Sequence, residues 1–296
     1  MGDSRDTPMR LMITGSTSFV GRYLVPLIEK QGWEIWHLVR RKSGYSNEII
    51  CDLKNPLPAD LPKCDVIVHL AAHVAFGQMM SIEQYSTNTL STIELADYAR
   101  RGDAYFIMAS MAAVHGFDKT LINAATPIEP DTHYAVSKYL AEECIRRMLD
   151  NYNILRIGGI YGIDGPDHLT LNRAIREAVC NHRAPTLKGP GQALRNYISV
   201  SDVARWIACL TADARQHKAS ADRQILYIAG EEVLRIESYL QTIVDIFLPD
   251  ETIYTVDGDE SRDQIVQPSP CPFKQTKFTE YLYSLQDDFS KNCNER

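Results

Sequence analysis

The sequence predicts an α/β protein with a doubly wound parallel sheet and a small C-terminal substrate-binding lobe. Short apolar runs rich in β-branched residues alternate with segments in which apolar residues recur every three or four positions, as in strands alternating with helices. The apolar runs are continuous, which is typical of strands covered on both faces. The chain has 296 residues, 45% of them apolar, which is enough to bury a sizeable core.

The first domain is predicted to span residues 9–165. Its apolar runs predict strands at Arg10–Thr14, Glu34–Val39, Ile49–Cys51, Val66–Leu70, Tyr105–Ala109 and Ile154–Ile157. Apolar residues at helical spacing predict helices at Gly21–Gln31, Ile82–Arg101 and Tyr134–Asn151. Strands that alternate with helices are joined by right-handed crossovers, so we expect a parallel sheet with helices on both faces.

The regular alternation of predicted strands and helices ends after Gly165. Residues 166–296 are predicted to form a small lobe, from which some segments return to the main domain. Ala184–Gly191 is rich in Pro and Gly, and the tail from Pro249 onward is mostly polar. Because open α/β sheets bind ligands at the carboxyl ends of their strands, we expect the lobe to close over a substrate. The predicted elements are helices at Leu169–Asn181 and Ile236–Leu248, a strand followed by a helix within Arg195–Leu210, and a strand at Ile225–Ala229.

The composition excludes several classes of protein. The formal net charge is −7 and the chain has no long basic run, which argues against nucleic-acid binding. Apolar runs such as Val66–Ala72 are far shorter than the roughly 20 residues of a membrane helix. The seven cysteines never form a CxxC pair, which favours a reduced, cytoplasmic setting. Met1–Pro8 is polar and is predicted to be a disordered extension rather than a signal peptide.

The segment Thr14–Gly21, which reads TGSTSFVG, joins the first predicted strand to the first predicted helix. A tight glycine turn lets backbone N–H groups approach a pyrophosphate, and the helix N-terminus adds a partial positive charge. Ser18 stands where the middle glycine of such loops is usual, and an ordinary strand–helix turn is the alternative. The residues predicted to contact a cofactor here are Gly15, Ser18, Phe19, Val20 and Gly21.

Further motifs follow in a fixed order, namely Cys51–Leu53, His69–Ala72, Tyr134–Lys138, Leu155–Gly162 and Arg195–Val203. With Thr14–Gly21 they cover about residues 9–210. In the identity and the order of these motifs, the chain resembles the extended branch of the short-chain dehydrogenase/reductase superfamily. That branch has a Rossmann-like fold and contains NAD(P)-dependent epimerases, dehydratases and reductases of nucleotide sugars.

The resemblance implies which residues surround the cofactor. Asp52 and Leu53 match residues that contact the adenine, and Leu70, Ala71 and Ala72 match a small apolar turn along the cofactor. In NAD-using relatives an acidic residue that binds the adenosine ribose ends the second strand. Here Val39 stands at that position and Arg40 follows. Because a guanidinium can pair with a 2′-phosphate that a carboxylate would repel, we expect NADP rather than NAD. A solvated basic turn is the alternative.

Tyr134 and Lys138 lie four residues apart on a predicted helix, about 40° apart around its axis and about 6 Å along it. The ammonium is expected to lower the pKa of the phenol, which would make Tyr134 an acid/base. The resemblance implies that Lys138 also binds the nicotinamide ribose. A solvated pair on a helix face is the alternative.

The third catalytic group of the family is a hydroxyl three residues before the Val of a Val-Tyr-Gly. Counting back from Val114 places Met111 at this position, and a methionine cannot donate a hydrogen bond. Ser110 lies one residue too early and is named as the catalytic hydroxyl only if the chain slips by one. Neighbouring residues of a strand point to opposite faces, so the two assignments exclude each other.

The resemblance implies a substrate side as well. Arg195 matches an arginine that binds a substrate diphosphate, and Asn172 and Leu187–Gly191 match segments that hold the nucleotide. A surface arginine is the alternative. His69 and His115 belong to motifs that need no metal, so we expect packing or substrate contact and no metal site.

The expected function is that of a nicotinamide-dependent oxidoreductase or epimerase of a nucleotide-linked sugar. Met111–Ala113 lacks the acidic pair of dehydratases, which disfavours dehydration. Reduction of a small carbonyl compound and a non-catalytic NADP-binding sensor stay open as alternatives. The expected partners are small molecules, not nucleic acid or membrane, and both a monomer and a homodimer stay open.

Overall fold

The computed structural model describes residues 8–75, 80–214 and 223–294. Residues 1–7, where most of the extension is expected, lie outside this part. The chain forms two compact units, each made of several segments. The first contains the described residues of 1–117, 127–157 and 204–227, and the second contains those of 118–126, 158–203 and 228–296.

The first unit contains a seven-stranded sheet with the order β12-β7-β5-β4-β1-β2-β3. Each pair of neighbours from β7 to β3 is parallel. The strands are β1 (Arg10–Thr14), β2 (Glu34–Val39), β3 (Glu48–Ile50), β4 (Val66–His69), β5 (Tyr105–Met111), β7 (Tyr152–Ile157) and β12 (Arg223–Ile228). The predicted parallel sheet is confirmed, with strand ends that differ by a few residues.

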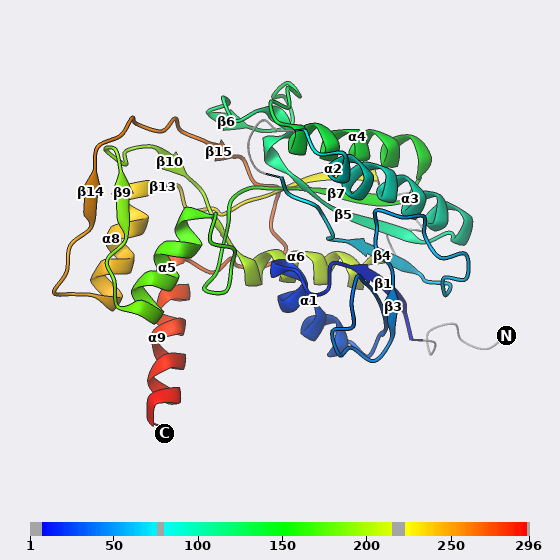
Figure 1. Ribbon diagram of the computed structural model, residues 1–296, viewed down its shortest axis with the longest axis horizontal. Helices are drawn as coiled ribbons and strands as arrows, with labels where there is room; N and C mark the ends of the chain where they lie inside the picture. Colours follow the sequence, from blue (N-terminus) through cyan, green and yellow to red (C-terminus); the bar gives the residue numbers. More distant parts are fainter. Residues whose placement is uncertain (1–7, 76–79, 215–222, 295–296) are drawn as a thin grey trace. The chain divides into compact units, whose positions relative to one another are not determined.

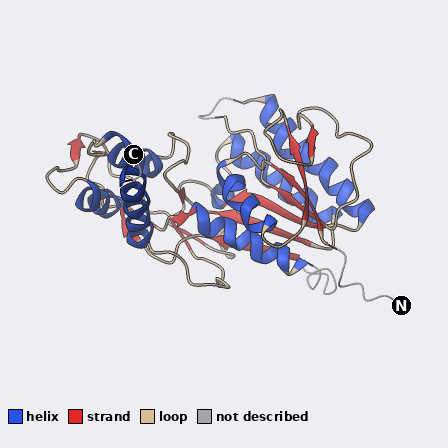
Figure 2. Cartoon of the chain, turned by 90° about the horizontal axis from the view of Figure 1, so that it is seen from below, coloured by secondary structure: helices blue, strands red, loops and turns tan. Residues whose placement is uncertain are grey.

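Helices cover both faces of this sheet, as Figures 1 and 2 show. One face carries α1 (Phe19–Glu29) and α6 (Val200–Ala212), whose residues from Ala204 onward belong to the first unit. The other carries α2 (Ile82–Tyr85), α3 (Ser91–Gly102) and α4 (His133–Met148). The predicted helix Ile82–Arg101 is therefore interrupted, because a π-helical turn at Ser86–Leu90 separates α2 from α3.

Apolar side chains of α3 and α4 pack against the strands to form the core of the first unit. Leu95 and Ile145 from these helices meet Met12, Ile67 and Phe106 from the sheet, and all five are completely buried. The apolar spacing that predicted the helices is thus the spacing of the residues that face the sheet.

The second unit packs three helices around a core of its own, α5 (Thr170–Asn181), α8 (Ile236–Phe247) and α9 (Phe278–Asn294). Its strands form short pairs, β8 (Ile160–Tyr161) with β11 (Ile198–Ser199), β9 (Thr186–Lys188) with β14 (Tyr254–Val256), β10 (Leu194–Arg195) with β13 (Leu234–Arg235), and β6 (Leu121–Ile122) with β15 (Ile265–Val266). The chain passes from the first unit to the second after Ile157, whereas the sequence placed the boundary after residue 165. Gly158, the first residue of this segment of the second unit, donates its N–H to Ile228 O.

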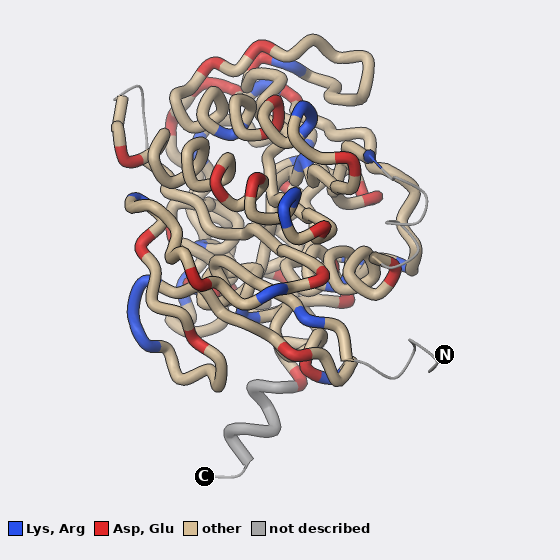
Figure 3. The backbone as a smooth tube through the Cα atoms, turned by 90° about the vertical axis from the view of Figure 1, so that its right-hand side faces the viewer, with Lys and Arg blue, Asp and Glu red and all other residues tan. Residues whose placement is uncertain are grey.

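The tail, expected to be mostly polar, contains ordered elements. Phe278, Tyr281, Leu282 and Leu285 of α9 recur at helical spacing and are buried in the core of the second unit. The many polar residues between them hide this period in the sequence. In the described part of the chain, no helix has the length and apolar character needed to span a bilayer. Lys and Arg are interspersed with Asp and Glu along the described chain (Figure 3).

Candidate active site

The loop between β1 and α1 allows very close packing of the backbone. Gly15 has φ of 76°, and a Cβ there would lie 2.7 Å from the Ala71 nitrogen. A Cβ on Gly21 would lie 2.2 Å from the Gly15 oxygen, so neither position tolerates a side chain. Ser18 caps α1, since its Oγ accepts a hydrogen bond of 3.2 Å from Gly21 N. Ser18, which stands where a glycine is usual, therefore stabilises the start of the helix as its N-cap.

A pocket of about 340 Å³ opens beside this loop. It brings together predicted cofactor residues from four separate segments, namely Gly15, Ser18, Arg40, Asp52, Leu53, Ala71 and Ala72. Phe19, Val20, Gly21, Leu70, Tyr134 and Lys138 are not among its described lining residues. The lining also contains residues that the sequence did not single out for a cofactor, Thr17, Leu38, Val39, Cys51, Lys54, His73, Val74 and Thr87.

The residues present here fit a dinucleotide. The glycine turn brings the backbone of Ala71 close to the start of α1, and the N-terminus of α1 favours negative charge. The Ser16 hydroxyl is buried and has no hydrogen-bond partner among the described residues. The strand β2 ends at Val39 without a carboxylate, and the exposed Arg40 follows it in the pocket wall.

Tyr134 and Lys138 stand one turn apart on α4. The helix begins after Thr132, whose Oγ1 accepts a hydrogen bond of 3.1 Å from Ala135 N. Tyr134 is half-buried, whereas Lys138 is only 2% exposed. Within the described chain, neither the phenol nor the ammonium has a hydrogen-bond partner. Two polar groups on one helix face are thus left available to a ligand.

The expected lowering of the pKa of Tyr134 by Lys138 is wrong for this structure. Burial raises the pKa of the phenol to about 12. Burial also lowers the pKa of Lys138 to about 8, a drop that the negative charge of Glu142 opposes. The phenol therefore keeps its proton at neutral pH.

The π-helical turn at Ser86–Leu90 is tied to α4. Asn88 Nδ2 donates to Ser137 Oγ at 3.0 Å and to His73 O at 2.9 Å, and Thr89 Oγ1 donates to Ser137 O at 2.8 Å. Ser137 precedes Lys138, so these bonds fix the part of α4 that carries the lysine. The extra residue of a π turn often occurs at functional sites.

His69 is a packing residue. Its Nδ1 accepts from Thr14 Oγ1 at 2.7 Å, and its Nε2 donates to Thr92 Oγ1 at 2.9 Å. Thr92 Oγ1 donates its single hydrogen to Asn88 O at 2.8 Å, so it must accept from His69 Nε2. The other ring nitrogen, Nδ1, is then the acceptor of the neutral imidazole. Burial lowers the pKa of His69 to about 3, so the ring is neutral. In the described part of the chain, no three His, Cys, Asp or Glu side chains gather to hold a metal ion.

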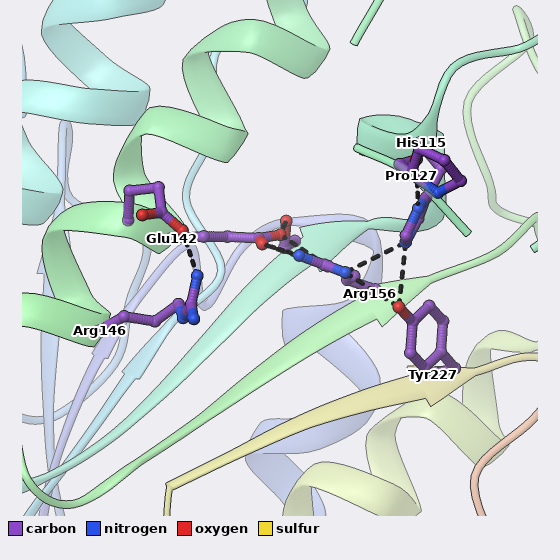
Figure 4. Close-up of polar contacts among 8 residues, drawn as sticks. His115, Pro127, Glu142, Arg146, Arg156 and Tyr227 are labelled. Carbon is purple, nitrogen blue, oxygen red and sulfur yellow. Dashed lines mark hydrogen bonds and ion pairs between the residues drawn. The ribbon is translucent and has the colours of Figure 1, made fainter. Parts of the chain in front are cut away.

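The hydroxyl of Ser110 donates to Glu142, which is completely buried. Glu142 Oε2 pairs with Arg156 Nη2 at 2.7 Å, and Arg156 Nη1 donates to His115 Nε2 at 3.1 Å and to Tyr227 Oη at 2.9 Å (Figure 4). Ser110 is thus engaged in a buried network of the first unit. This contact weighs against its assignment as the catalytic hydroxyl, and the adjacent Met111 ends β5 half-buried.

The second unit has a pocket of about 500 Å³. Its described lining carries the cations Arg173, Lys188 and Arg195 and contains no carboxylate. Arg195 is half-buried, and its Nη1 donates to Leu194 O at 2.8 Å and to Arg262 O at 2.6 Å. Asn172 is not part of the lining. It is completely buried, and its Oδ1 accepts a hydrogen bond of 3.0 Å from Gly162 N.

Residues 11–225 match the model of the NAD dependent epimerase/dehydratase family. A putative UDP-glucose 4-epimerase of Methanocaldococcus jannaschii is 25% identical over 216 residues, which are 66% of this chain and 71% of the relative. A UDP-N-acetyl-alpha-D-glucosaminuronate decarboxylase of Bacillus cytotoxicus is 28% identical over 262 residues, 79% of each chain.

Solved structures of low identity share the fold. UDP-glucuronic acid 4-epimerase from Bacillus cereus, in complex with UDP-glucuronic acid and NAD, matches with a TM-score of 0.76 and 17% identity over 96% of this chain and 99% of the other. UDP-N-acetylglucosamine 4-epimerase from Bacillus cereus matches with a TM-score of 0.78 and 20% identity over 95% and 96%.

Proposed function

The chain belongs to the NAD-dependent epimerase/dehydratase family, and from this premise we propose that it is a nicotinamide-dependent oxidoreductase or epimerase of a nucleotide-linked sugar. Reduction of a sugar ketone is the favoured reaction. The observation that carries the proposal is the pair Tyr134 and Lys138, one turn apart on α4, with no hydrogen-bond partner for phenol or ammonium among the described residues.

Tyr134 is assigned the proton transfer. A bound nicotinamide cofactor supplies or accepts the hydride at the sugar carbon. In the reductive direction, the phenol gives its proton to the carbonyl oxygen and regains a proton from water. A pKa of about 12 keeps this proton in place at neutral pH, so the phenol is in the protonated form that a general acid requires.

Lys138 is assigned the binding of the cofactor. Its ammonium, which can donate three hydrogen bonds, would hold the hydroxyls of the nicotinamide ribose. With a pKa of about 8, most of the lysine is protonated at pH 7. The hydrogen bonds of Asn88 and Thr89 to Ser137 support this role, because they hold the helix turn that carries the lysine.

The pocket of the second unit is proposed to bind the nucleotide diphosphate. Arg173, Lys188 and Arg195 line it, and the backbone carbonyls that accept from Arg195 hold its guanidinium in one orientation. A fork of fixed N–H donors suits a diphosphate. These cations argue against a small neutral carbonyl compound as the substrate.

NADP is proposed as the preferred cofactor on the strength of Arg40, which lines the dinucleotide pocket where no carboxylate ends β2. The solved epimerase described above contains NAD. NAD is therefore the alternative, and the relative affinity for the two cofactors decides between them.

A second candidate function is a cofactor-binding protein that catalyses no reaction. Met111 favours it, since it stands where the family has a hydroxyl, and the nearby Ser110 is engaged with Glu142. The decisive experiment screens the protein loaded with NADPH or NADH against 4-keto nucleotide sugars and simple ketones, following absorbance of the reduced nicotinamide. Turnover of a nucleotide-linked ketone alone supports the first proposal. Cofactor binding without turnover of any compound supports the second.

A further inference from the structure

The turn after β2 is folded around one carboxylate. Residues 40–42 are Arg, Arg and Lys, and all three are exposed. Glu48, the first residue of β3, faces the turn that follows them. Its Oε1 accepts hydrogen bonds from Ser43 N at 2.8 Å, Ser43 Oγ at 2.6 Å and Tyr45 N at 3.0 Å. Between these donors, Gly44 has φ of 95°, which only glycine adopts without strain.

The same turn is attached to the phosphate loop. The ring of Tyr45 stacks on that of His37, with centroids 4.1 Å apart and planes inclined by 7°. His37 belongs to β2 and is buried, and burial lowers its pKa to about 4, so a neutral ring receives the stack. Tyr45 Oη donates to Ser16 O at 3.4 Å. The turn is therefore fixed to β2, to β3 and to the loop that precedes α1.

Glu48 is ionised at neutral pH. The hydrogen bond from the Ser43 hydroxyl, together with the backbone donors of the turn, holds the pKa of Glu48 below its usual range. A negative charge beside a phosphate site repels the phosphate, so charge alone makes Glu48 unfavourable there. Glu48 can favour phosphate binding only through the three hydrogen bonds that it accepts, because they hold the turn in one conformation.

We propose that Glu48 is a positioning residue for NADP, which holds the turn at 40–45 so that Arg40 stays in the wall of the dinucleotide pocket and meets the 2′-phosphate. This inference rests on the proposed preference for NADP. It adds that the preference depends on an anionic residue that never touches the phosphate.

The sign of the effect separates positioning from charge. If Glu48 contributed only its charge, its removal would strengthen the binding of a 2′-phosphate. If it positions Arg40, removal of its side chain weakens that binding. Glu48→Gln keeps an oxygen that can accept the three bonds and removes the charge, whereas Glu48→Ala removes both.

The test uses 2′,5′-ADP and 5′-AMP, which differ by the 2′-phosphate alone. Calorimetry on the full chain gives the ratio of the two Kd values for the native protein and each variant. We expect Glu48→Ala to lower the preference for 2′,5′-ADP by about tenfold or more, as loss of a charge-assisted cluster of hydrogen bonds does. Glu48→Gln is expected to keep the preference or raise it.

Two further variants secure the result. Glu29→Gln removes an exposed carboxylate whose charge also acts on Tyr45, without touching the turn, and is expected to leave the preference unchanged. Ser43→Ala removes one hydrogen bond from an exposed residue and is expected to lower the preference by about threefold. It keeps the inference testable if Glu48→Ala does not fold.

The outcomes are distinct. If the native protein binds 2′,5′-ADP no more tightly than 5′-AMP, the proposed NADP preference is wrong and the role of Glu48 falls with it. If the native protein prefers 2′,5′-ADP and both Glu48→Ala and Ser43→Ala keep or raise that preference, only the role of Glu48 is overturned.

Discussion

The Ser110 hydroxyl donates a hydrogen bond to Glu142, a completely buried carboxylate on α4. Glu142 also accepts from Arg156 Nε at 3.1 Å and Nη2 at 2.7 Å. Removing one partner of a buried ionic network costs more than the pair contributes, because the remaining groups lose solvation without compensation. Ser110 therefore has a structural task one residue away from the position where the family has a catalytic hydroxyl.

Ser110→Ala is expected to lower the free energy of unfolding by about 1–3 kcal/mol, since it leaves a buried carboxylate with one donor fewer. Turnover should change little, and Met111→Ser should raise it. Chemical denaturation and steady-state rates check the two effects separately. A loss of about 10²-fold in the chemical step of Ser110→Ala, with stability unchanged, would instead identify this hydroxyl as the catalytic donor.

Tyr134→Phe is expected to reduce turnover by at least about 10²-fold, because it removes the transferable proton and little else. Cofactor affinity should stay close to that of the native protein. The matched control is Tyr139→Phe on the same helix. Equal turnover in Tyr134→Phe and the native protein would contradict the proposed mechanism.

Lys138 makes stability depend on pH in a defined direction. Burial lowers its pKa from 10.5 to about 8, so between these values the unfolded chain binds the proton and the native protein has released it. A rise in pH from about 8 toward about 10 therefore stabilises the native protein relative to Lys138→Met. The full effect approaches about 3 kcal/mol.

The measurement for Lys138 is the difference in free energy of unfolding between the native protein and Lys138→Met at pH 8, 9 and 10. A difference that is constant or moves against the native protein with rising pH would show that the lysine is not desolvated as described.

Arg40→Ala is expected to lower the preference for NADP over NAD by about tenfold or more, because a forked cation contacts the additional phosphate. Arg41→Ala is the matched control, since Arg41 is not among the described lining residues of the pocket. Titration with both cofactors gives the ratio. If the ratio of NADP to NAD affinity is the same in the native protein and in Arg40→Ala, the end of β2 is an ordinary solvated turn and does not select the cofactor.

Arg195→Ala is expected to raise the KM for a nucleotide-linked substrate by about tenfold or more and to change kcat far less, since it removes uniform binding of the diphosphate. Arg183→Ala is the control, an exposed arginine of the second unit outside this pocket. A simple ketone lacking a diphosphate should be unaffected by either change. A fall in kcat without a change in KM would contradict the assignment.

Local patterns determined much of this fold. The continuous apolar runs of β1, β2, β4 and β5 were identified from the sequence, as was the glycine loop after β1, because strand burial and tight turns depend on neighbouring residues. The helix α9 was missed, since its buried residues are separated by polar ones that face away from the core.

Tertiary structure decided the chemistry of individual side chains. Ser110 is engaged by Glu142, which lies 32 positions away along the chain, and the turn after β2 is held by a stack on His37 and a bond to Ser16. The spacing of Tyr134 and Lys138 was evident in the sequence, yet burial reversed the expected direction of the phenol pKa. Spacing along a helix depends on the chain alone, whereas desolvation and hydrogen-bond partners depend on which distant segments pack together.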